Sequence, residues 1–394
     1  MKAIEIKENI FWVGAVDWDR RLFDSLIPLP DGTSYNSYLV RGSEKTALID
    51  TVDPFWRSVL LERLDDLHIE NLDFIVANHA EQDHSGTLPY VAAKFPRAQV
   101  ITTPKGKDLL VKLLHCEEGR IVTVEDGEKV SLGDKTLEFI HAPWVHWPET
   151  MFTYLREDKV LFSCDFFGSH LATSSLYCDE EWRVCEAAKR YFAQVMMPYR
   201  AAIRRNLQKI EGYSIEMIAP SHGPVHRDPQ CIVESHREWA SDAVRNVVVL
   251  PYISMHGSTQ IMADYLTEAL AARGVQVEKF NLAVADTGKM AMALVDAATI
   301  VVGSPTVLAG AHPQVISACF LANALRPKVK FASVIGSYGW GGKMVEQISE
   351  TISNLKVELL EPVVIPGLPR EEDYKALDRL ASDILAKHKE SGLV

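Results

Sequence analysis

The chain has 394 residues, which is long enough for two domains with sizeable buried cores. Its apolar content of 47% and charged content of 24% are ordinary for a globular protein. The formal net charge of -12, with no stretch that gathers Lys and Arg, argues against a nucleic-acid partner.

The N-terminal segment and the cysteines indicate the compartment. "MKAIEIKENIFWVG" alternates like a β-strand and lacks the apolar stretch of a signal peptide, and no run of about 18 apolar residues could span a membrane. The six cysteines lie far apart in sequence and form no CxxC pair, which gives little support to disulfides or a zinc ribbon. We therefore expect a soluble, cytoplasmic protein with free, mostly buried thiols and no membrane partner.

The first part of the chain predicts many strands and few helices. Apolar or alternating runs bounded by turn residues indicate strands, and leucines at helical spacing predict a helix at 57–67. A helical block is expected between about 180 and 211. The expected strands lie at 10–16, 34–42, 45–52, 72–79, 98–103, 120–124, 135–142, 150–157, 159–165 and, with a loop, 215–223.

The order of predicted strands and helices changes near residue 245. Four apolar strands, expected to begin near 246, 298, 330 and 356, are separated by helix-length segments, which is typical of a doubly wound parallel sheet. The charged segment "ESHREWASDAVRN" is the best candidate for a linker. We therefore predict two domains, at 1–245 and 246–394.

A cluster of possible metal ligands follows a buried strand in "VANHAEQDHSG", residues 76–86. A lone loop histidine is usually solvated, but four ligand-type residues within six positions are hard to explain as surface. Three further candidates also follow β-like runs, so one sheet edge could present them all. The full set is His79, Glu81, Asp83, His84, His146, Asp165 and His222. It is larger than one ion needs and suits two, with the carboxylate of Asp165 free to bridge them.

The His-x-x-x-Asp-His motif, with a later His, an Asp and a His in a Gly-containing loop, resembles the metallo-β-lactamase fold. That family's zinc hydrolases usually carry His-x-His-x-Asp-His, whereas this chain has Glu81 at the second histidine. Oxygen ligands shift the preference from zinc toward iron or manganese, and a carboxylate-bridged pair with imidazoles suits redox-active iron. Together with "HWPETM", the motif resembles the flavodiiron proteins, also called A-type flavoproteins or rubredoxin:oxygen oxidoreductases, over essentially the whole chain.

This resemblance implies an α/β fold in two parts. A metallo-β-lactamase-like αββα sandwich at 1–245 would carry the diiron site, and a flavodoxin-like doubly wound parallel sheet at 246–394 would bind FMN. One iron would be bound by His79, Glu81 and His146 and the second by Asp83 and His222, with Asp165 bridging. His84 matches a position that is a ligand in some members and turned away in others.

The remaining histidines are expected to lie outside the ligand set. Pro220-Ser221-His222-Gly223 fits the family's Pro-x-His-Gly segment, so His222 is expected to bind and His226 to lie behind the ligands or at the surface. His115, His141 and His170 fit no ligand position. Trp147 is expected to pack, and could wall the pocket.

Three loops of the second part could bind flavin mononucleotide. The first opens a helix, where N–H groups and hydroxyls can bind a phosphate, and the absence of a Walker lysine or GxGxxG disfavours ATP and dinucleotides. The later loops also follow strands, and Tyr338 and Trp340 could stack on a flat ring, unless Trp340 only packs between loops. The loops resemble those of flavodoxin, although 307–309 replace an Asn common in the family. The expected residues are Ser254, Met255, His256, Gly257, Ser258, Thr259, Pro305, Thr306, Val307, Leu308, Ala309, Gly310, Ser337, Tyr338, Gly339, Trp340 and Gly341.

The resemblance implies an oxidoreductase that reduces dioxygen to water, nitric oxide to nitrous oxide, or both. Electrons would pass through FMN from rubredoxin, a reduced deazaflavin coenzyme or another small electron donor. A head-to-tail homodimer, or a dimer of such dimers, would place one subunit's flavin beside the other's irons. Ser25 and Leu26 stand where some relatives carry His and Tyr, which predicts an apolar pocket wall. The alternatives are a zinc hydrolase fused to a flavodoxin domain and an electron carrier whose metal site is structural.

Overall fold

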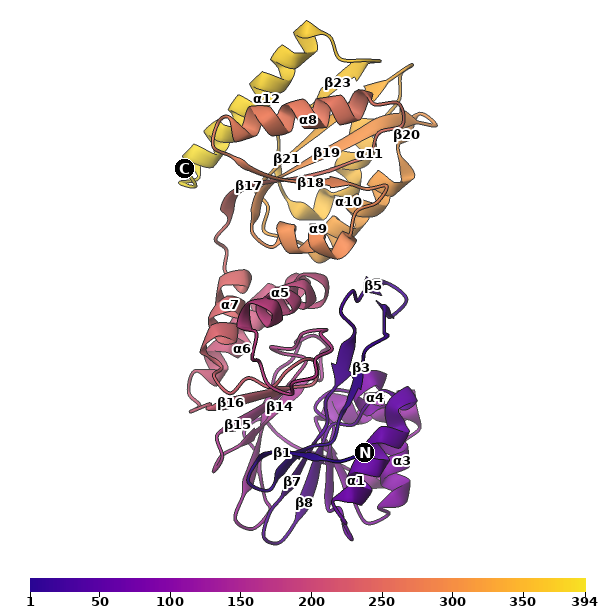
Figure 1. The fold of residues 1–394 in the computed structure, drawn as a ribbon, viewed down its shortest axis with the longest axis vertical. Coiled ribbons are helices and arrows are strands. Elements are labelled where there is room, and N and C mark those ends of the chain that lie inside the picture. The colour runs from indigo at the N-terminus through magenta and orange to yellow at the C-terminus, as the bar shows by residue number, and fades with distance from the viewer. The chain divides into compact units, whose positions relative to one another are not determined.

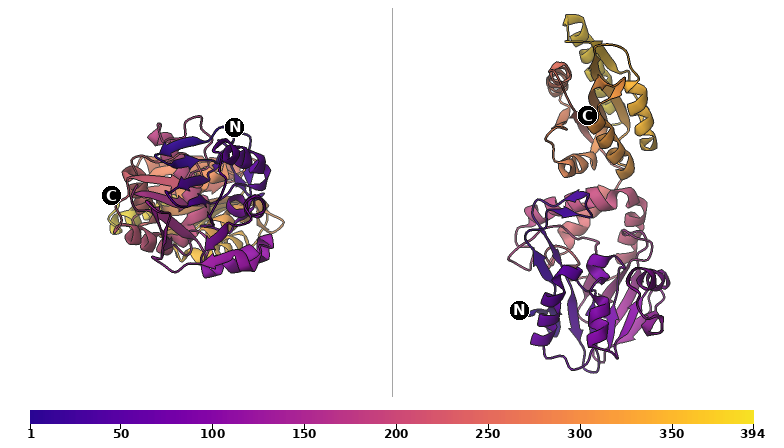
Figure 2. Two further views of the ribbon diagram at one scale, coloured as in Figure 1. Left: turned by 90° about the horizontal axis from the view of Figure 1, so that it is seen from below. Right: turned by 90° about the vertical axis from the view of Figure 1, so that its right-hand side faces the viewer.

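The computed structural model describes residues 1–394, and the chain divides into two compact units. The first contains residues 1–191 and 199–240, and the second contains residues 192–198 and 241–394. Figures 1 and 2 show that each unit is built from layers of sheets and helices. The domain boundary that the sequence suggests, between 245 and 246, stays a prediction. None of the helices combines the length and the apolar character that a membrane crossing requires.

Two sheets form the middle of the first unit. The first sheet has, in spatial order, β1 (Ile4–Lys7), β2 (Ile10–Trp12), β7 (Tyr38–Arg41), β8 (Thr46–Ile49), β9 (Phe74–Val76), β10 (Gln99–Thr102) and β11 (Ile121–Thr123). The second has β12 (Lys129–Ser131), β13 (Thr136–His141), β14 (Met151–Leu155), β15 (Val160–Cys164) and β16 (Met217–Pro220). Two short pairs join β3 (Ala15–Asp17) to β6 (Thr33–Tyr35) and β4 (Leu22–Phe23) to β5 (Ile27–Pro28).

The first sheet is buried on both faces, which explains its continuous apolar strands. In β7, Tyr38 and Val40 join the core between the two sheets, whereas Leu39 joins the core beneath the outer helices. Successive side chains of a strand point to opposite faces, so one run supplies both cores. Full burial of each Leu or Ile side chain contributes about 1.5–3 kcal/mol to the stability of the fold, which favours this layered arrangement.

Helices form the outer layers of the first unit. Helices α1, α3 and α4 cover the outer face of the first sheet (Figure 1), while α6 and α7 lie beside the second. Their bounds are α1 (Arg57–Asp66), α2 (Gln82–Ser85), α3 (Leu88–Lys94), α4 (Pro104–Leu114), α5 (Glu181–Tyr191), α6 (Arg200–Ile210) and α7 (Gln230–Ala240). Short 3₁₀ turns lie at Pro54–Trp56 and Glu118–Arg120. A π turn (Phe192–Met196) and a 3₁₀ turn (Met197–Tyr199) follow α5, and their residues 192–198 are counted with the second unit. The unit is therefore the αββα sandwich that the resemblance implies.

The second unit is a parallel sheet with helices. Its spatial order β18-β17-β19-β21-β22, with β23 beside β21, is the flavodoxin-like order. The strands are β17 (Arg245–Tyr252), β18 (Gln276–Asn281), β19 (Ala297–Val307), β20 (Gly310–Ala311), β21 (Phe331–Tyr338), β22 (Glu358–Leu359) and β23 (Val363–Pro366). The helices are α8 (Ser258–Ala271), α9 (Thr287–Leu294), α10 (Pro313–Leu325), α11 (Met344–Thr351) and α12 (Glu371–Glu390), with a 3₁₀ turn at Ser353–Leu355.

Two expectations about this sheet are wrong in detail. Strand β18 was not predicted, because it lies at the sheet edge and none of its residues is buried, so it has no continuous apolar run. The segment predicted as one strand at 356–367 forms β22 and β23, which both pair with β21. Pro362 separates them, and proline has no N–H to donate to a sheet.

Candidate metal centre and ligand-binding loops

The seven predicted metal ligands lie together at strand ends of the first unit. His79, Glu81, Asp83 and His84 follow β9, and the last two of them lie in α2. His146 lies in the β13–β14 loop. Asp165 comes directly after β15, and His222 follows shortly after β16. The donors therefore come from both sheets, and the expectation that one sheet edge presents them all is wrong. Two facing sheets allow the donors to converge from opposite sides.

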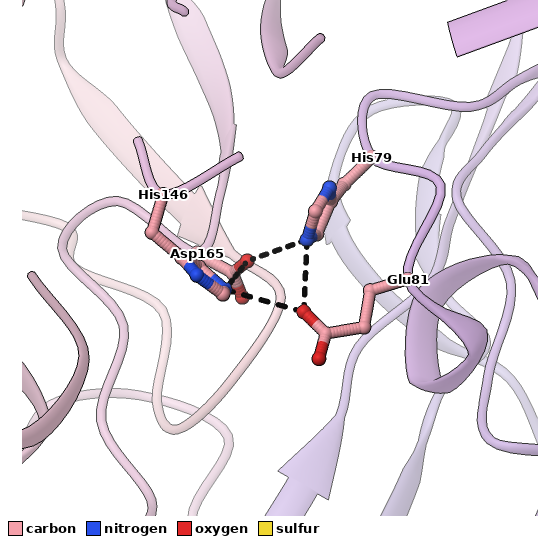
Figure 3. Close-up of side chains that lie close together, drawn as sticks. All are labelled: His79, Glu81, His146 and Asp165. Atoms are coloured by element: carbon pink, nitrogen blue, oxygen red, sulfur yellow. Dashed lines mark hydrogen bonds and ion pairs between the residues drawn. The ribbon is translucent and has the colours of Figure 1, made fainter. Parts of the chain in front are cut away.

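Four side chains form the first group of donor atoms, shown in Figure 3. Glu81 Oε2 lies 3.0 Å from His79 Nε2 and 3.2 Å from His146 Nε2. Asp165 Oδ2 lies 3.6 Å from the same nitrogen of His79 and 3.5 Å from that of His146. All four side chains therefore point at one small volume.

The second group lies on the other side of Asp165. His84 Nε2 lies 3.3 Å from Asp83 Oδ1 and 3.0 Å from Asp165 Oδ1. His222 Nε2 lies 3.1 Å from Asp83 Oδ2 and 3.4 Å from Asp165 Oδ1. The two oxygens of Asp165 thus face different groups, and His84 points into the site.

The residues fit two metal ions. Donor atoms that each lie about 2.1 Å from one ion, with bonds about 90–120° apart, are roughly 3.0–3.6 Å from each other. The donor separations in both groups fall in that interval. All four carboxylate oxygens of Asp83 and Asp165 are buried and accept no hydrogen bond, although ring nitrogens are close. Buried carboxylates without donors are costly unless a cation balances them.

Charge balance in the metal-free chain depends on the imidazoles. Burial alone raises the pKa of Asp165, but the rings of His84, His146 and His79 outweigh it and hold this pKa well below its usual range. Burial lowers the pKa of His79, but hydrogen bonds to Glu149 and Glu81 raise it to about 10. A metal ion would replace these protons, because only neutral imidazoles and ionised carboxylates bind metals.

Outer partners orient two of the ligand rings. Glu149 Oε1 lies 2.7 Å from His79 Nδ1 and also accepts the Ala80 N–H at 3.1 Å. The Nδ1 atom of His222 lies 2.6 Å from the Ser34 carbonyl oxygen, to which it donates. These bonds leave each Nε2 lone pair directed into the site. Glu149 was missed by sequence reasoning, although it lies within the "HWPETM" segment beside His146.

A buried polar brace supports the segment that carries His79. Asp50 accepts the Asn78 backbone N–H at 2.7 Å and the Asn78 side-chain amide at 2.9 Å. The amide oxygen of Asn78 accepts from Thr153 Oγ1 at 2.7 Å, which ties β9 to the second sheet. Burial raises the pKa of Asp50 to about 6. No local sequence signal links Asp50 to the site, because its role arises from the contact between strands.

His115, His141, His170 and His226, which match no ligand position in the sequence, belong to neither donor group, and two of them are buried. His226 is buried rather than at the surface, and burial lowers its pKa to about 4. His170 packs against His222 with ring centroids 4.7 Å apart, and its Nδ1 lies 2.8 Å from Thr33 Oγ1. His170 therefore helps to position His222 from behind.

Aromatic rings wall the candidate metal centre. Trp147 meets His79 edge-on at 4.9 Å between centroids, and Phe23 lies 6.3 Å from His222. Ser25 and Leu26 do not form this wall, because both are exposed at the tip of the β4–β5 hairpin and Leu26 is 70% exposed. The apolar wall expected at these two positions is thus supplied by Phe23 in the same hairpin.

The first and third predicted flavin loops meet at the carboxyl ends of β17 and β21. Gly257 has a φ of 90° and precedes α8, whose first turn points its N–H groups toward this end of the sheet. Thr259 Oγ1 lies 3.4 Å from Ser337 Oγ, which connects the two loops. This helix N-terminus is suited to a phosphate.

The second predicted loop is a hairpin. Strand β19 extends to Val307 and pairs with β20 across a turn in which Leu308 and Ala309 have positive φ values. The backbone N–H of Lys343 donates to the Ala309 carbonyl at 2.9 Å, so this turn contacts the end of the third loop. Leu308 is 97% exposed and Trp340 is 79% exposed. Trp340 therefore does not merely pack between loops.

Comparison with known proteins agrees with the folds of both units. Residues 33–223 match the family described as ODP family beta lactamase, and residues 250–377 match flavodoxin. The chain is 36% identical to a nitric oxide reductase of Moorella thermoacetica, covering 98% of this chain and 99% of that protein. The solved rubredoxin oxygen:oxidoreductase of Desulfovibrio gigas has a TM-score of 0.95 at 29% identity and covers 100% of both chains. A flavodiiron protein of Giardia intestinalis has a TM-score of 0.91 at 28% identity, covering 98% and 96%.

The fold and the comparisons define the class: an oxidoreductase that joins a metallo-β-lactamase-like unit to a flavodoxin-like unit. The chain belongs to the flavodiiron protein family.

Proposed function

We propose that this protein reduces dioxygen to water, nitric oxide to nitrous oxide, or both, at a non-haem diiron centre that receives electrons through FMN. The observation that carries the proposal is the placement of Asp165. Its two oxygens face separate donor groups, each within 3.0–3.6 Å of two imidazole nitrogens. A single-ion hydrolytic site needs no such shared carboxylate.

Seven side chains would hold the iron pair. His79, Glu81 and His146 would bind one ion, and Asp83, His84 and His222 the other, while Asp165 bridges them. The irons would supply the electrons and the open positions at which the gas binds. Glu149 and the Ser34 carbonyl keep the ring nitrogens oriented. Trp147 and Phe23, whose rings lie against two of these histidines, would limit the access of water.

The three loops of the second unit would hold FMN. The N-terminus of α8 would bind the phosphate, and the Leu308–Ala309 turn together with Tyr338 and Trp340 would border the ring. FMN would convert electrons from the donor into single-electron transfers. The exposure of Leu308 and Trp340 supports this assignment, because large apolar side chains at the carboxyl end of a parallel sheet suit a flat ligand.

The electron donor and the assembly follow from the family resemblance. We propose rubredoxin or a reduced deazaflavin coenzyme as the donor, and a head-to-tail homodimer that brings one subunit's flavin close to the other's irons. Because electron transfer slows steeply with distance, such an arrangement would serve a chain whose two cofactors lie in different units.

The test compares gas consumption with cofactor content. Purified protein is assayed for iron, zinc and flavin, then supplied with reduced rubredoxin while electrodes follow dioxygen or nitric oxide. The proposal expects about two irons and one FMN per chain, and consumption of at least one gas that requires both cofactors. Zinc in place of iron, with no gas consumption, would favour the hydrolase fusion. Reoxidation of the reduced flavin by dioxygen at the same rate with and without iron would favour the electron carrier.

A further inference from the structure

Two cysteines that are distant in sequence meet in the first unit. Cys185 lies in α5 and Cys231 in α7, 46 positions later, and their Sγ atoms are 3.5 Å apart. All six cysteines are free thiols, and four of them, including this pair, are half-buried, so the expectation of mostly buried thiols is wrong. The two sulfurs thus lie in contact with each other, in residues that are both half-buried.

Closing the pair requires little movement. A disulfide has a sulfur–sulfur distance of about 2.05 Å, so the sulfurs would approach by roughly 1.5 Å. Side-chain rotation can supply such a change without moving the helices far, because the two sulfurs are already in contact. Helices α5 and α7 lie side by side (Figure 1). The pair therefore has the sulfur-to-sulfur proximity that a disulfide needs.

The two thiols differ in their surroundings. Burial, together with the neighbouring carboxylate of Glu181 and the Cys185 thiol, raises the pKa of Cys231 to about 12. Cys231 therefore stays protonated near neutral pH and is a poor first nucleophile, since the thiolate is the reactive form. This leaves Cys185 as the thiol that reacts first in the step below.

We propose that Cys185 and Cys231 form a reversible disulfide that joins α5 to α7 when a peroxide oxidises the protein. The Cys185 thiolate attacks one oxygen of hydrogen peroxide, the O–O bond breaks, and a sulfenic acid forms. The released hydroxide takes up the proton that Cys185 lost, giving water. Cys231 sulfur then attacks Cys185 sulfur, the S–O bond breaks, and the hydroxyl leaves as water with the Cys231 proton. Two thiols and one peroxide give one disulfide and two waters.

The position of the pair connects it to the candidate metal centre. Helix α5 ends at Tyr191, whose ring centroid lies 6.0 Å from that of His222. Helix α7 carries His236, which packs on Phe166 and Phe167 directly after Asp165. The disulfide would therefore link two helices that each contact a candidate ligand or a residue next to one. This inference does not depend on the proposed function.

Peptide mapping of the holoprotein tests the proposal. The reduced protein is treated with increasing hydrogen peroxide, blocked with N-ethylmaleimide, digested with trypsin and analysed without reductant. We expect peptide 184–189 linked to peptide 228–237, as the main form of both cysteines, and its loss after dithiothreitol. Cys185→Ser and Cys231→Ser should each abolish the link, and Cys178→Ser, which removes a half-buried thiol nearby, should leave it intact.

Trapping identifies the first nucleophile and completes the test. Dimedone should label Cys185 in the Cys231→Ser variant and should not label Cys231 in the Cys185→Ser variant. Flavin and iron contents of each variant show whether it has folded. The proposal is overturned if Cys185 and Cys231 stay fully reactive toward N-ethylmaleimide at peroxide levels that oxidise Cys178, or if the link joins Cys178 instead.

Discussion

The two candidate sites of this protein are built in opposite ways. The metal centre consists of buried side chains, and its donors His79 and Asp165 are almost fully enclosed. The flavin loops are formed largely by backbone, and their large side chains Leu308 and Trp340 are exposed. A site made of side chains depends on residue identity, whereas a site made of backbone depends on turn conformation. Substitutions should therefore act on the two sites by different physical causes.

The largest expected effect comes from Asp165→Asn. The amide cannot supply two anionic oxygens, so both donor groups lose their shared ligand. We expect the iron content to fall toward zero and gas consumption to fall by at least about 100-fold. Loss of a residue that only hydrogen-bonds to a metal ligand already lowers metal affinity or activity by up to about 100-fold. Flavin content should not change. Iron and flavin assays with electrode measurements check this, and His115→Asn, an exposed left-handed helix cap, is the matched control.

A smaller effect is expected from Glu149→Gln. The amide oxygen can still accept a hydrogen bond from His79, but the negative charge that strengthens the ligand is lost. We expect iron to bind about 10-fold more weakly, measured by retention during a chelator challenge. The exposed Glu8→Gln serves as the control, and an unchanged iron affinity in Glu149→Gln would show that His79 needs no charged partner.

Gly257→Ala tests whether the flavin site depends on backbone conformation. A Cβ at this position would meet no atom within 4 Å, so the substitution is disfavoured only by the positive φ of 90°. The strain of about 1–2 kcal/mol should weaken FMN binding by roughly 5- to 30-fold without changing iron content. Gly339→Ala also meets open space but has no positive φ, so flavin titration should show little change. Equal effects of the two substitutions would contradict the backbone account.

The smallest effect is expected from Trp340→Ala. Loss of an aromatic contact with the ring should weaken FMN binding by about 2- to 12-fold, corresponding to roughly 0.5–1.5 kcal/mol. Titration of the flavin-free protein with FMN, followed by flavin fluorescence, measures the change. Trp182→Ala removes a tryptophan of similar exposure from α5 and should have no effect.

The sequence predicts the sites unequally, for physical reasons. Spacing within residues 79–84 brings four metal-type side chains to one strand end, and such side chains are rarely buried together unless they bind a cation. Glu149 and Asp50 have no local signal, because Glu149 acts on His79, and Asp50 on the neighbouring Asn78, through tertiary contacts. The Leu308–Ala309 turn was not expected, since neither residue favours a positive φ. The Cys185–Cys231 contact joins residues 46 positions apart and has no local signal.

The fold was easier to predict where burial is complete. Strands such as β7 and β19 form apolar runs because both faces of their sheets are covered. Strand β18 is half-exposed at an edge, so its polar residues gave no such run. Partial exposure thus limits the prediction of both strands and ligand-binding loops.

The most direct test of the central claim is anaerobic stopped-flow spectroscopy of the fully reduced protein, mixed with dioxygen and, separately, with nitric oxide. Flavin reoxidation is followed in the wild type and in Asp165→Asn with equal flavin content. The account predicts fast reoxidation by at least one gas in the wild type and loss of the fast phase in the variant. Equally fast reoxidation in both proteins would show that the flavin reacts without the metal centre and would contradict the account.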